Sequence, residues 1–181
     1  LIEDEGFEAV FIGTGAGLPK FMGIPGENAN GVFSANEYLT RSNLMKAFDD
    51  SYDTPIVAGT KVAVIGGGIA ALEETLYLSK ICSNVTLIHR RNKFRADSNL
   101  IDSVKSITNV KVLTDKSVVK FNEEDGKLVS IDIKNNLDKI ETITVDGCFE
   151  YIGQEPNTSN FSNLNILDDD GYIKVNNDFL K

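Results

Sequence analysis

The fold of this chain is decided by one stretch, Lys61–Arg95, which reads KVAVIGGGIAALEETLYLSKICSNVTLIHRRNKFR. An apolar segment typical of a strand, Val62–Ile65, runs into three glycines, Gly66–Gly68, and a helical pattern follows them. A second strand-like segment, Val85–Ile88, ends in His-Arg-Arg. The order strand, glycine turn, helix, strand is that of the βαβ unit that binds the pyrophosphate of a dinucleotide. The sequence therefore predicts an α/β, Rossmann-like domain with a parallel sheet.

Each position of the glycine turn meets a physical requirement. Gly66 makes a turn that is too tight for a Cβ, and Gly68 lacks a side chain so that the backbone can approach a pyrophosphate closely. Ala71 must be small because the helix packs near the strand there. The start of the helix carries a partial positive charge and unpaired N–H groups, which suit a phosphate.

The residues after the second strand indicate which dinucleotide is bound. An NAD-type site would place an Asp or Glu about 20 residues past the glycines, to hold a free ribose 2′-hydroxyl. That place holds His89, Arg90 and Arg91 instead, and Arg95 follows shortly after. Arginine is a good partner for a phosphate, so the sequence predicts NADP(H). The alternative is that these arginines form a solvated face or pair with the acids of the chain.

His89 is the single histidine of the chain, which argues against a metal ligand. We expect it to pack beside the phosphate or to form a hydrogen bond with it. The two cysteines, Cys82 and Cys148, form no C-x-x-C, so neither a zinc site nor a local disulfide is indicated. Both are predicted to be buried thiols.

The overall composition limits the classes of partner. A formal charge of −9 and a pI near 4.6 argue against a nucleic-acid binder. The longest nearly unbroken apolar run, Val62–Leu72, is too short and too rich in glycine to span a bilayer. The acidic start, Leu1–Glu5, is unlike a signal peptide. These features predict a cytoplasmic protein without membrane partners.

The remaining segments predict a cover for the sheet. A strand over residues 9–12 leads into Gly13–Gly17, which we interpret as a tight crossing because Pro19 disfavours a helix on a phosphate there. Ser34–Glu37 resembles a capping box that opens a helix through Phe48. A helix is expected over 97–107 and a strand over 149–152, with a last strand over Tyr172–Val175. Four short segments and the Asp125-Gly126 turn predict a β-meander: 110–113, 118–121, 128–133 and 140–145. With helices on one side of the parallel sheet and this meander on the other, we expect a domain of three layers.

Two parts of the chain resemble known flavoprotein reductases. The elements VAVIGGG and LIHRRNKFRA, with VDGCFEYIGQEPNT further on, resemble the NADPH-binding domain of low-molecular-weight thioredoxin reductases. The first third, including FIGTGAGLPKFMGIPGENANGVFSANEYL, is similar to the small subunit of NADPH-dependent glutamate synthase. Both belong to the pyridine nucleotide-disulfide oxidoreductase superfamily. This resemblance implies an NADPH domain inserted within an FAD domain, with hydride passing from the nicotinamide to the flavin.

The resemblance also implies domain bounds and cofactor contacts. It places a flavin-domain stub at 1–32, the NADPH domain at 33–147 and a returning stub at 148–181. It assigns no catalytic or metal-binding residue in this chain. The implied cofactor-binding residues are Gly66, Gly67, Gly68, Ile69 and Ala70 at the pyrophosphate, His89, Arg90, Arg91 and Arg95 at the 2′-phosphate, Glu73 near the nicotinamide, and Gly153 near the nicotinamide or the domain junction.

One departure from the resemblance narrows the expected chemistry. Thioredoxin reductases carry a C-x-x-C before the glycine-rich strand, whereas this chain has Thr54–Ala58 there, without cysteine. We therefore expect the NADPH domain of a flavin-dependent reductase that lacks this dithiol step, with FAD present only in the intact parent. Its expected partners are NADPH, an FAD domain or flavoprotein, and a second copy of the chain. The alternatives are an isolated NADP(H)-binding module without turnover and an interaction fragment that binds no nucleotide.

Overall fold

The structure is a computed structural model that describes residues 4–8, 18–47, 49, 51–54 and 59–174. The chain divides into two compact units, Pro19–Gly153 and a smaller one made of Leu1–Leu18 and Gln154–Lys181. The strand predicted over 9–12, the Gly13–Gly17 cluster and the helix end at Phe48 lie outside the described residues. No helix in the described part is long and apolar enough to cross a membrane.

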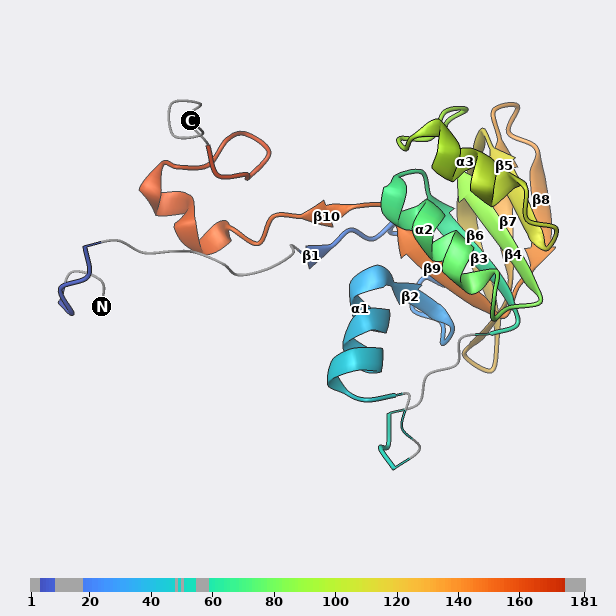
Figure 1. Ribbon diagram of the computed structural model, residues 1–181, viewed down its shortest axis with the longest axis horizontal. Coiled ribbons are helices and arrows are strands. Elements are labelled where there is room, and N and C mark those ends of the chain that lie inside the picture. The colour runs from blue at the N-terminus through green and yellow to red at the C-terminus, as the bar shows by residue number, and fades with distance from the viewer. Residues whose placement is uncertain (1–3, 9–17, 48, 50, 55–58, 175–181) are drawn as a thin grey trace. The chain divides into compact units, whose positions relative to one another are not determined.

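The larger unit is built on a five-stranded sheet whose strands are all parallel, in the order β2-β9-β3-β4-β5 (Figure 1). The strands are β2 (Val32–Ser34), β3 (Lys61–Gly66), β4 (Asn84–His89), β5 (Val110–Thr114) and β9 (Gly147–Tyr151). The prediction that residues 110–113 belong to the meander was wrong. They form β5, which pairs in parallel with β4 at the edge of the sheet. Such pairing joins segments that are distant in sequence, so local pattern does not specify it.

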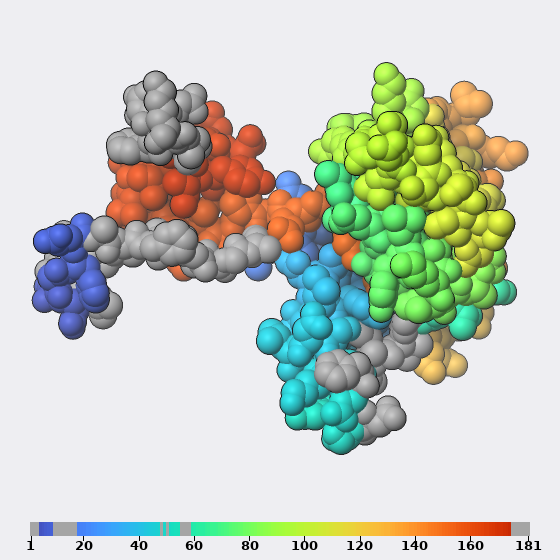
Figure 2. All heavy atoms as spheres, in the orientation of Figure 1, coloured from blue at the N-terminus to red at the C-terminus, as the bar shows by residue number. Residues whose placement is uncertain are grey.

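Helices cover one face of this sheet and an antiparallel meander covers the other (Figure 1). The helices are α1 (Ala35–Leu39), α2 (Ile69–Leu78) and α3 (Ser98–Lys105), and the meander consists of β6 (Lys116–Glu124), β7 (Lys127–Asn135) and β8 (Ile140–Thr144). Side chains alternate between the two cores, so that Leu87 packs with the helices and Ile88 with the meander. In the space-filling view, the green and yellow-green atoms of α2 and α3 cover this side of the sheet (Figure 2). The predicted three-layer, Rossmann-like fold is confirmed.

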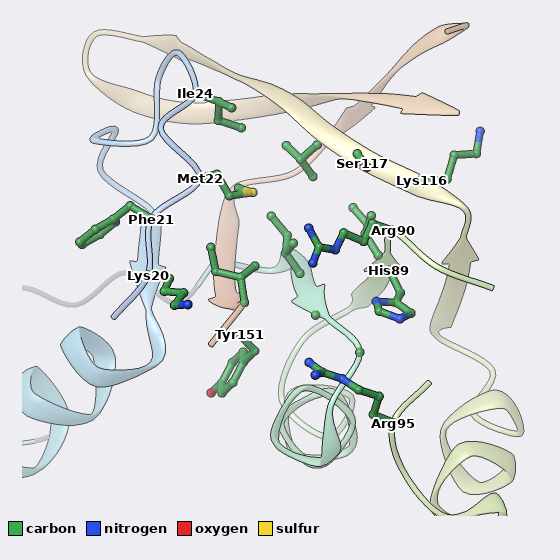
Figure 3. Close-up of a pocket in the computed structure, with 16 residues that line it drawn as sticks. Lys20, Phe21, Met22, Ile24, His89, Arg90, Arg95, Lys116, Ser117 and Tyr151 are labelled. Atoms are coloured by element: carbon green, nitrogen blue, oxygen red, sulfur yellow. The ribbon is translucent and has the colours of Figure 1, made fainter. Parts of the chain in front are cut away.

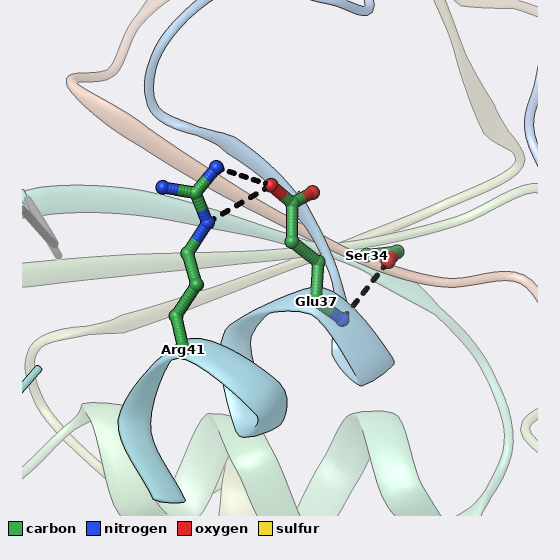
Figure 4. A network of polar contacts seen from close by, with 3 residues as sticks. All are labelled: Ser34, Glu37 and Arg41. Carbon is green, nitrogen blue, oxygen red and sulfur yellow. Dashed lines mark hydrogen bonds and ion pairs between the residues drawn. The ribbon is translucent and has the colours of Figure 1, made fainter. Parts of the chain in front are cut away.

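The helix predicted after Ser34 begins as expected and then changes form. The Ser34 side chain accepts a hydrogen bond from the Glu37 N–H at 3.2 Å, which caps α1 (Figure 4). The Glu37 carboxylate accepts from the Arg41 guanidinium at 2.9 Å and 3.1 Å. The chain then continues as a π-helix, η1 (Thr40–Leu44). The capping-box prediction is therefore confirmed for its serine half.

The turn between β6 and β7 has the predicted hairpin form. Asp125 and Gly126 have φ values of +50° and +74°, so both lie in the left-handed region that a type I′ turn requires. The two cysteines are free and buried, as predicted.

The smaller unit contains little regular structure among its described residues. It holds the 3₁₀ helix η2 (Ser159–Leu164) and an isolated antiparallel bridge between Leu167 and Ile173. We predicted a strand over Tyr172–Val175, and its described residues, 172–174, form this single bridge. Two short strands, β1 (Leu18–Pro19) and β10 (Gln154–Glu155), pair with each other.

The compact units differ from the domain bounds implied by the resemblance. The larger unit continues to Gly153, whereas the implied NADPH domain ends at residue 147. The larger unit extends past residue 147 because β9 lies between β2 and β3 in the interior of the parallel sheet. The assignment of the two chain ends to a flavin domain stays a prediction.

Candidate nucleotide-binding site

The three glycines after β3 differ in what surrounds them. A Cβ on Gly66 would lie 2.7 Å from the Tyr151 carbonyl oxygen and 2.8 Å from the Ala71 Cβ, so only glycine fits. A Cβ on Gly67 would lie 2.1–2.4 Å from three atoms of the His89 ring. A Cβ on Gly68 would meet no atom within 4 Å. The first two glycines are therefore required by packing within the protein, and the third leaves open space in front of the helix.

The start of α2 is left without a side-chain cap. Gly68 is its N-cap residue and offers no side chain, whereas Ser34 caps α1 and Asp97 caps α3 through side-chain oxygens. The first N–H groups of a helix have no partner within the helix, and together with the helix dipole they favour an anion. The uncapped start of α2, beside the open space at Gly68, is thus suited to a phosphate.

His89 acts as packing beneath the glycine loop. Its ring is 7 % exposed, lies against Gly67 and stacks on Phe94 at 5.2 Å between ring centres. Its Nε2 lies 3.0 Å from the Lys93 carbonyl oxygen, which can only accept, so Nε2 carries the proton. Burial lowers the pKa of His89, and the neighbouring arginines lower it further. The histidine is therefore neutral at physiological pH and fills the space that a side chain on Gly67 would need.

Backbone bonds tie the arginine segment to the glycine loop. The Arg95 N–H donates to the Gly67 carbonyl at 2.7 Å, and Gly68 and Arg95 form a parallel bridge. Arg90, Arg91 and Arg95 are all exposed. None of the ion pairs between described residues involves these three arginines, although the chain carries 27 acidic residues. Their guanidinium groups are therefore available to an external anion.

A cavity of about 570 Å³ opens at the carboxyl ends of β9, β3 and β4. Figure 3 shows the Arg90 and Arg95 guanidinium groups directed toward the same side of it. Of the predicted residues, the cavity is lined by Gly66, Gly67, His89, Arg90 and Arg95. The other predicted residues do not line it: Gly68, Ile69, Ala70, Glu73, Arg91 and Gly153. Glu73 is exposed on α2, and its neighbour Glu74 is half-buried beside Tyr151.

Several lining residues were missed in the sequence. One wall comes from the segment after β1 (Lys20, Phe21, Met22 and Ile24), and another from the start of β6 (Lys116, Ser117 and Val118). Neither segment carries a recognisable nucleotide motif. Tyr151 was missed as well, although its place at the carboxyl end of a predicted strand was a usable signal. Within the described part of the chain, no cluster of acids, cysteines and histidine is suited to a metal ion.

Comparison with known proteins identifies the family. A model of the pyridine nucleotide-disulphide oxidoreductases matches residues 3–180. The chain belongs to this family. Among curated members, thioredoxin reductases from Bacillus subtilis (strain 168) and Coxiella burnetii (strain RSA 493 / Nine Mile phase I) are 34% and 36% identical to it, over 171 and 172 residues. The glucosaminate ammonia-lyase of Pseudomonas fluorescens is 35% identical over 175 residues.

Solved structures agree with this oxidoreductase assignment. The Lactococcus lactis thioredoxin reductase superposes with a TM-score of 0.70 at 27% identity, covering 90% of this chain and 50% of that one. The Streptococcus pyogenes thioredoxin reductase gives 0.66 at 26% identity with the same coverage. The three curated relatives are each covered over 93% of this chain and 49–50% of their own length. The chain thus spans about half the length of the relatives it matches.

Proposed function

We propose that the chain is the NADPH-binding part of a flavin-dependent oxidoreductase of this family, with FAD held by the intact parent. The observation that supports this most is the group Arg90, Arg91 and Arg95, exposed and without a described acidic partner, next to the open glycine loop. When bound, NADPH would supply a hydride to the flavin. The residues of this chain would bind the cofactor and orient it.

The proposed contacts follow from the placement of charge. The pyrophosphate would lie at Gly68 and the uncapped start of α2, where the backbone is open to approach. The 2′-phosphate would lie at Arg90, Arg91 and Arg95. A charge-assisted hydrogen bond contributes roughly 1.5–3 kcal/mol, so two of them would favour NADPH over NADH by on the order of 10²- to 10⁴-fold.

The electron acceptor is a finer part of the proposal. The chain has no C-x-x-C before β3, so the electrons would leave the flavin by another route than this dithiol. The resemblance of the first third to glutamate synthase small subunits is the basis for placing the parent among flavin-dependent reductases that work without this dithiol.

Paired titrations test the cofactor assignment. We expect the chain to bind NADPH far more tightly than NADH, and Arg90→Ala with Arg91→Ala to weaken NADPH by about 10²-fold or more while changing NADH little. Arg41→Ala is the matched control, because Arg41 is the chain's arginine outside this group and pairs with Glu37 instead. Equal weakening of both nucleotides by the double substitution would contradict the 2′-phosphate assignment.

An absorption spectrum recorded before the titrations separates the alternatives. A yellow protein with a flavin spectrum would mean that these residues hold FAD themselves. A colourless protein that binds NADPH without oxidising it would favour the isolated binding module. A melting temperature that NADPH leaves unchanged would favour the fragment that binds no nucleotide.

A further inference from the structure

We propose that Tyr151 receives the nicotinamide end of the dinucleotide. This inference rests on the proposed function above and extends it to the other end of the ligand. Tyr151 ends β9, which flanks β3 on the side opposite to β4, and it lines the cavity (Figure 3).

The direction of the ligand follows from the order of the strands. β9, β3 and β4 are neighbours in the sheet, so their carboxyl ends follow one another along its edge, about 4.8 Å apart. These ends carry Tyr151, Gly66 and His89 in that order. A 2′-phosphate at the arginines after β4 puts the adenosine on that side and the pyrophosphate at the glycine loop. The nicotinamide half is then left to extend toward β9.

Tyr151 is fixed in position by both of its ends. Its carbonyl oxygen and Cβ lie 2.7 Å and 3.0 Å from where a Cβ on Gly66 would be, so its backbone packs directly against the glycine loop. Its side chain lies beside the half-buried Glu74 side chain on α2. Burial raises the pKa of both groups, as expected for a pair that is partly withdrawn from water. The ring is therefore anchored to the helix and the sheet, and it is half-exposed at the cavity.

An anchored aromatic ring suits this end of the ligand. Nicotinamide is a flat ring, and an aromatic side chain offers it a matching surface with little loss of side-chain freedom. The competing explanation is that Tyr151 only packs against the helix-side core, as Tyr38 does. A filling role would affect stability and would not distinguish ligands that differ only in the nicotinamide.

Two ligands that share the 2′-phosphate end provide the test. Binding of NADP⁺ and of 2′-phospho-ADP-ribose, which lacks nicotinamide, is measured by calorimetry on the full chain. We expect Tyr151→Ala to weaken NADP⁺ by roughly five- to thirtyfold and to leave 2′-phospho-ADP-ribose within about twofold. Unchanged binding of the second ligand also shows that the variant is folded. Tyr151→Phe keeps the ring and loses only the hydroxyl, so it should weaken NADP⁺ by less than about threefold.

Tyr77→Ala is the matched control. Tyr77 lies on α2 as Glu74 does, is 55% exposed and does not line the cavity, so both ligands should bind its variant as they bind the wild type. Equal changes for the two ligands in Tyr151→Ala, or no change in either, would overturn the nicotinamide assignment while leaving the dinucleotide site in place. Wild-type protein that binds neither ligand would overturn the dinucleotide proposal, and this one with it.

Discussion

Glu150 gives a testable prediction about stability because it is a buried acid that forms no ion pair with another described residue. Its side chain is 4% exposed on β9, and its Oε1 has no hydrogen-bond partner among the described residues. The carboxylate nearest to it, Glu27, already accepts from the Met22 N–H, from the Gly23 N–H at 2.7 Å and from the Ile24 N–H at 3.3 Å. Burial, together with the charge of Glu27, raises the pKa of Glu150 from 4.5 to about 8.

The sign of the pH effect follows from this raised pKa. The folded protein holds the Glu150 proton more tightly than the unfolded chain, so the stabilisation is complete below pH 4.5 and is lost as the pH rises to about 8. At about 1.36 kcal/mol per pKa unit, the loss approaches 5 kcal/mol, an order-of-magnitude figure comparable to the whole stability of a small domain. Glu150→Gln should abolish it, because the amide does not ionise between pH 5 and pH 9.

Urea unfolding of the wild type and of Glu150→Gln between pH 5 and pH 9 measures this effect. We expect similar free energies of unfolding near pH 5 and a variant that is several kcal/mol more stable at pH 9, with the gap opening steadily between them. Glu141→Gln is a control of opposite sign, since the exposed Glu141 bonds to Lys116 and its pKa is lowered. Parallel pH profiles for wild type and Glu150→Gln would refute the reasoning, because they would mean that Glu150 titrates alike in both states.

Two further predictions concern the glycine loop and the turn at the opposite end of β3. Gly67→Ala should destabilise the protein by about 1–3 kcal/mol in urea unfolding, because the added methyl group displaces the His89 ring. Gly68→Ala should leave the stability nearly unchanged and weaken the binding of NADPH in a titration. Equal losses of stability in the two variants would contradict this difference. Asp146→Ala should lower the free energy of unfolding by about 1–2 kcal/mol, because the Asp146 carboxylate accepts hydrogen bonds from the Thr60 and Lys61 N–H groups at 2.8 Å and 2.7 Å. An unchanged urea midpoint would show that these exposed hydrogen bonds do not contribute to stability.

Local pattern was enough to predict the strand, the glycine turn and the arginine segment beside the cavity, but not the residues that form the cavity's other walls. The strand, the glycine turn and the arginines are contiguous motifs, and each element lies where the sequence placed it. We assigned β5 to the wrong sheet because the sequence of a five-residue strand does not indicate which strand it pairs with. Lys20 and Ser117 both line the cavity although they are almost 100 residues apart in the sequence. Hydrophobic periodicity within each segment does not indicate that the two segments meet.

The glycine motif and the arginine motif form a single packing unit. The His89 ring occupies the space that a side chain on Gly67 would take, and the Arg95 N–H bonds to the carbonyl of the same glycine. A substitution at Gly67 would therefore push on the histidine that precedes Arg90 and would disturb the strand end that positions the charges. Conversely, keeping His89 neutral and buried leaves the positive charge to the arginines at the surface. This packing fixes the separation between the glycine loop and the arginines, as the proposed ligand, with its pyrophosphate and 2′-phosphate, would require.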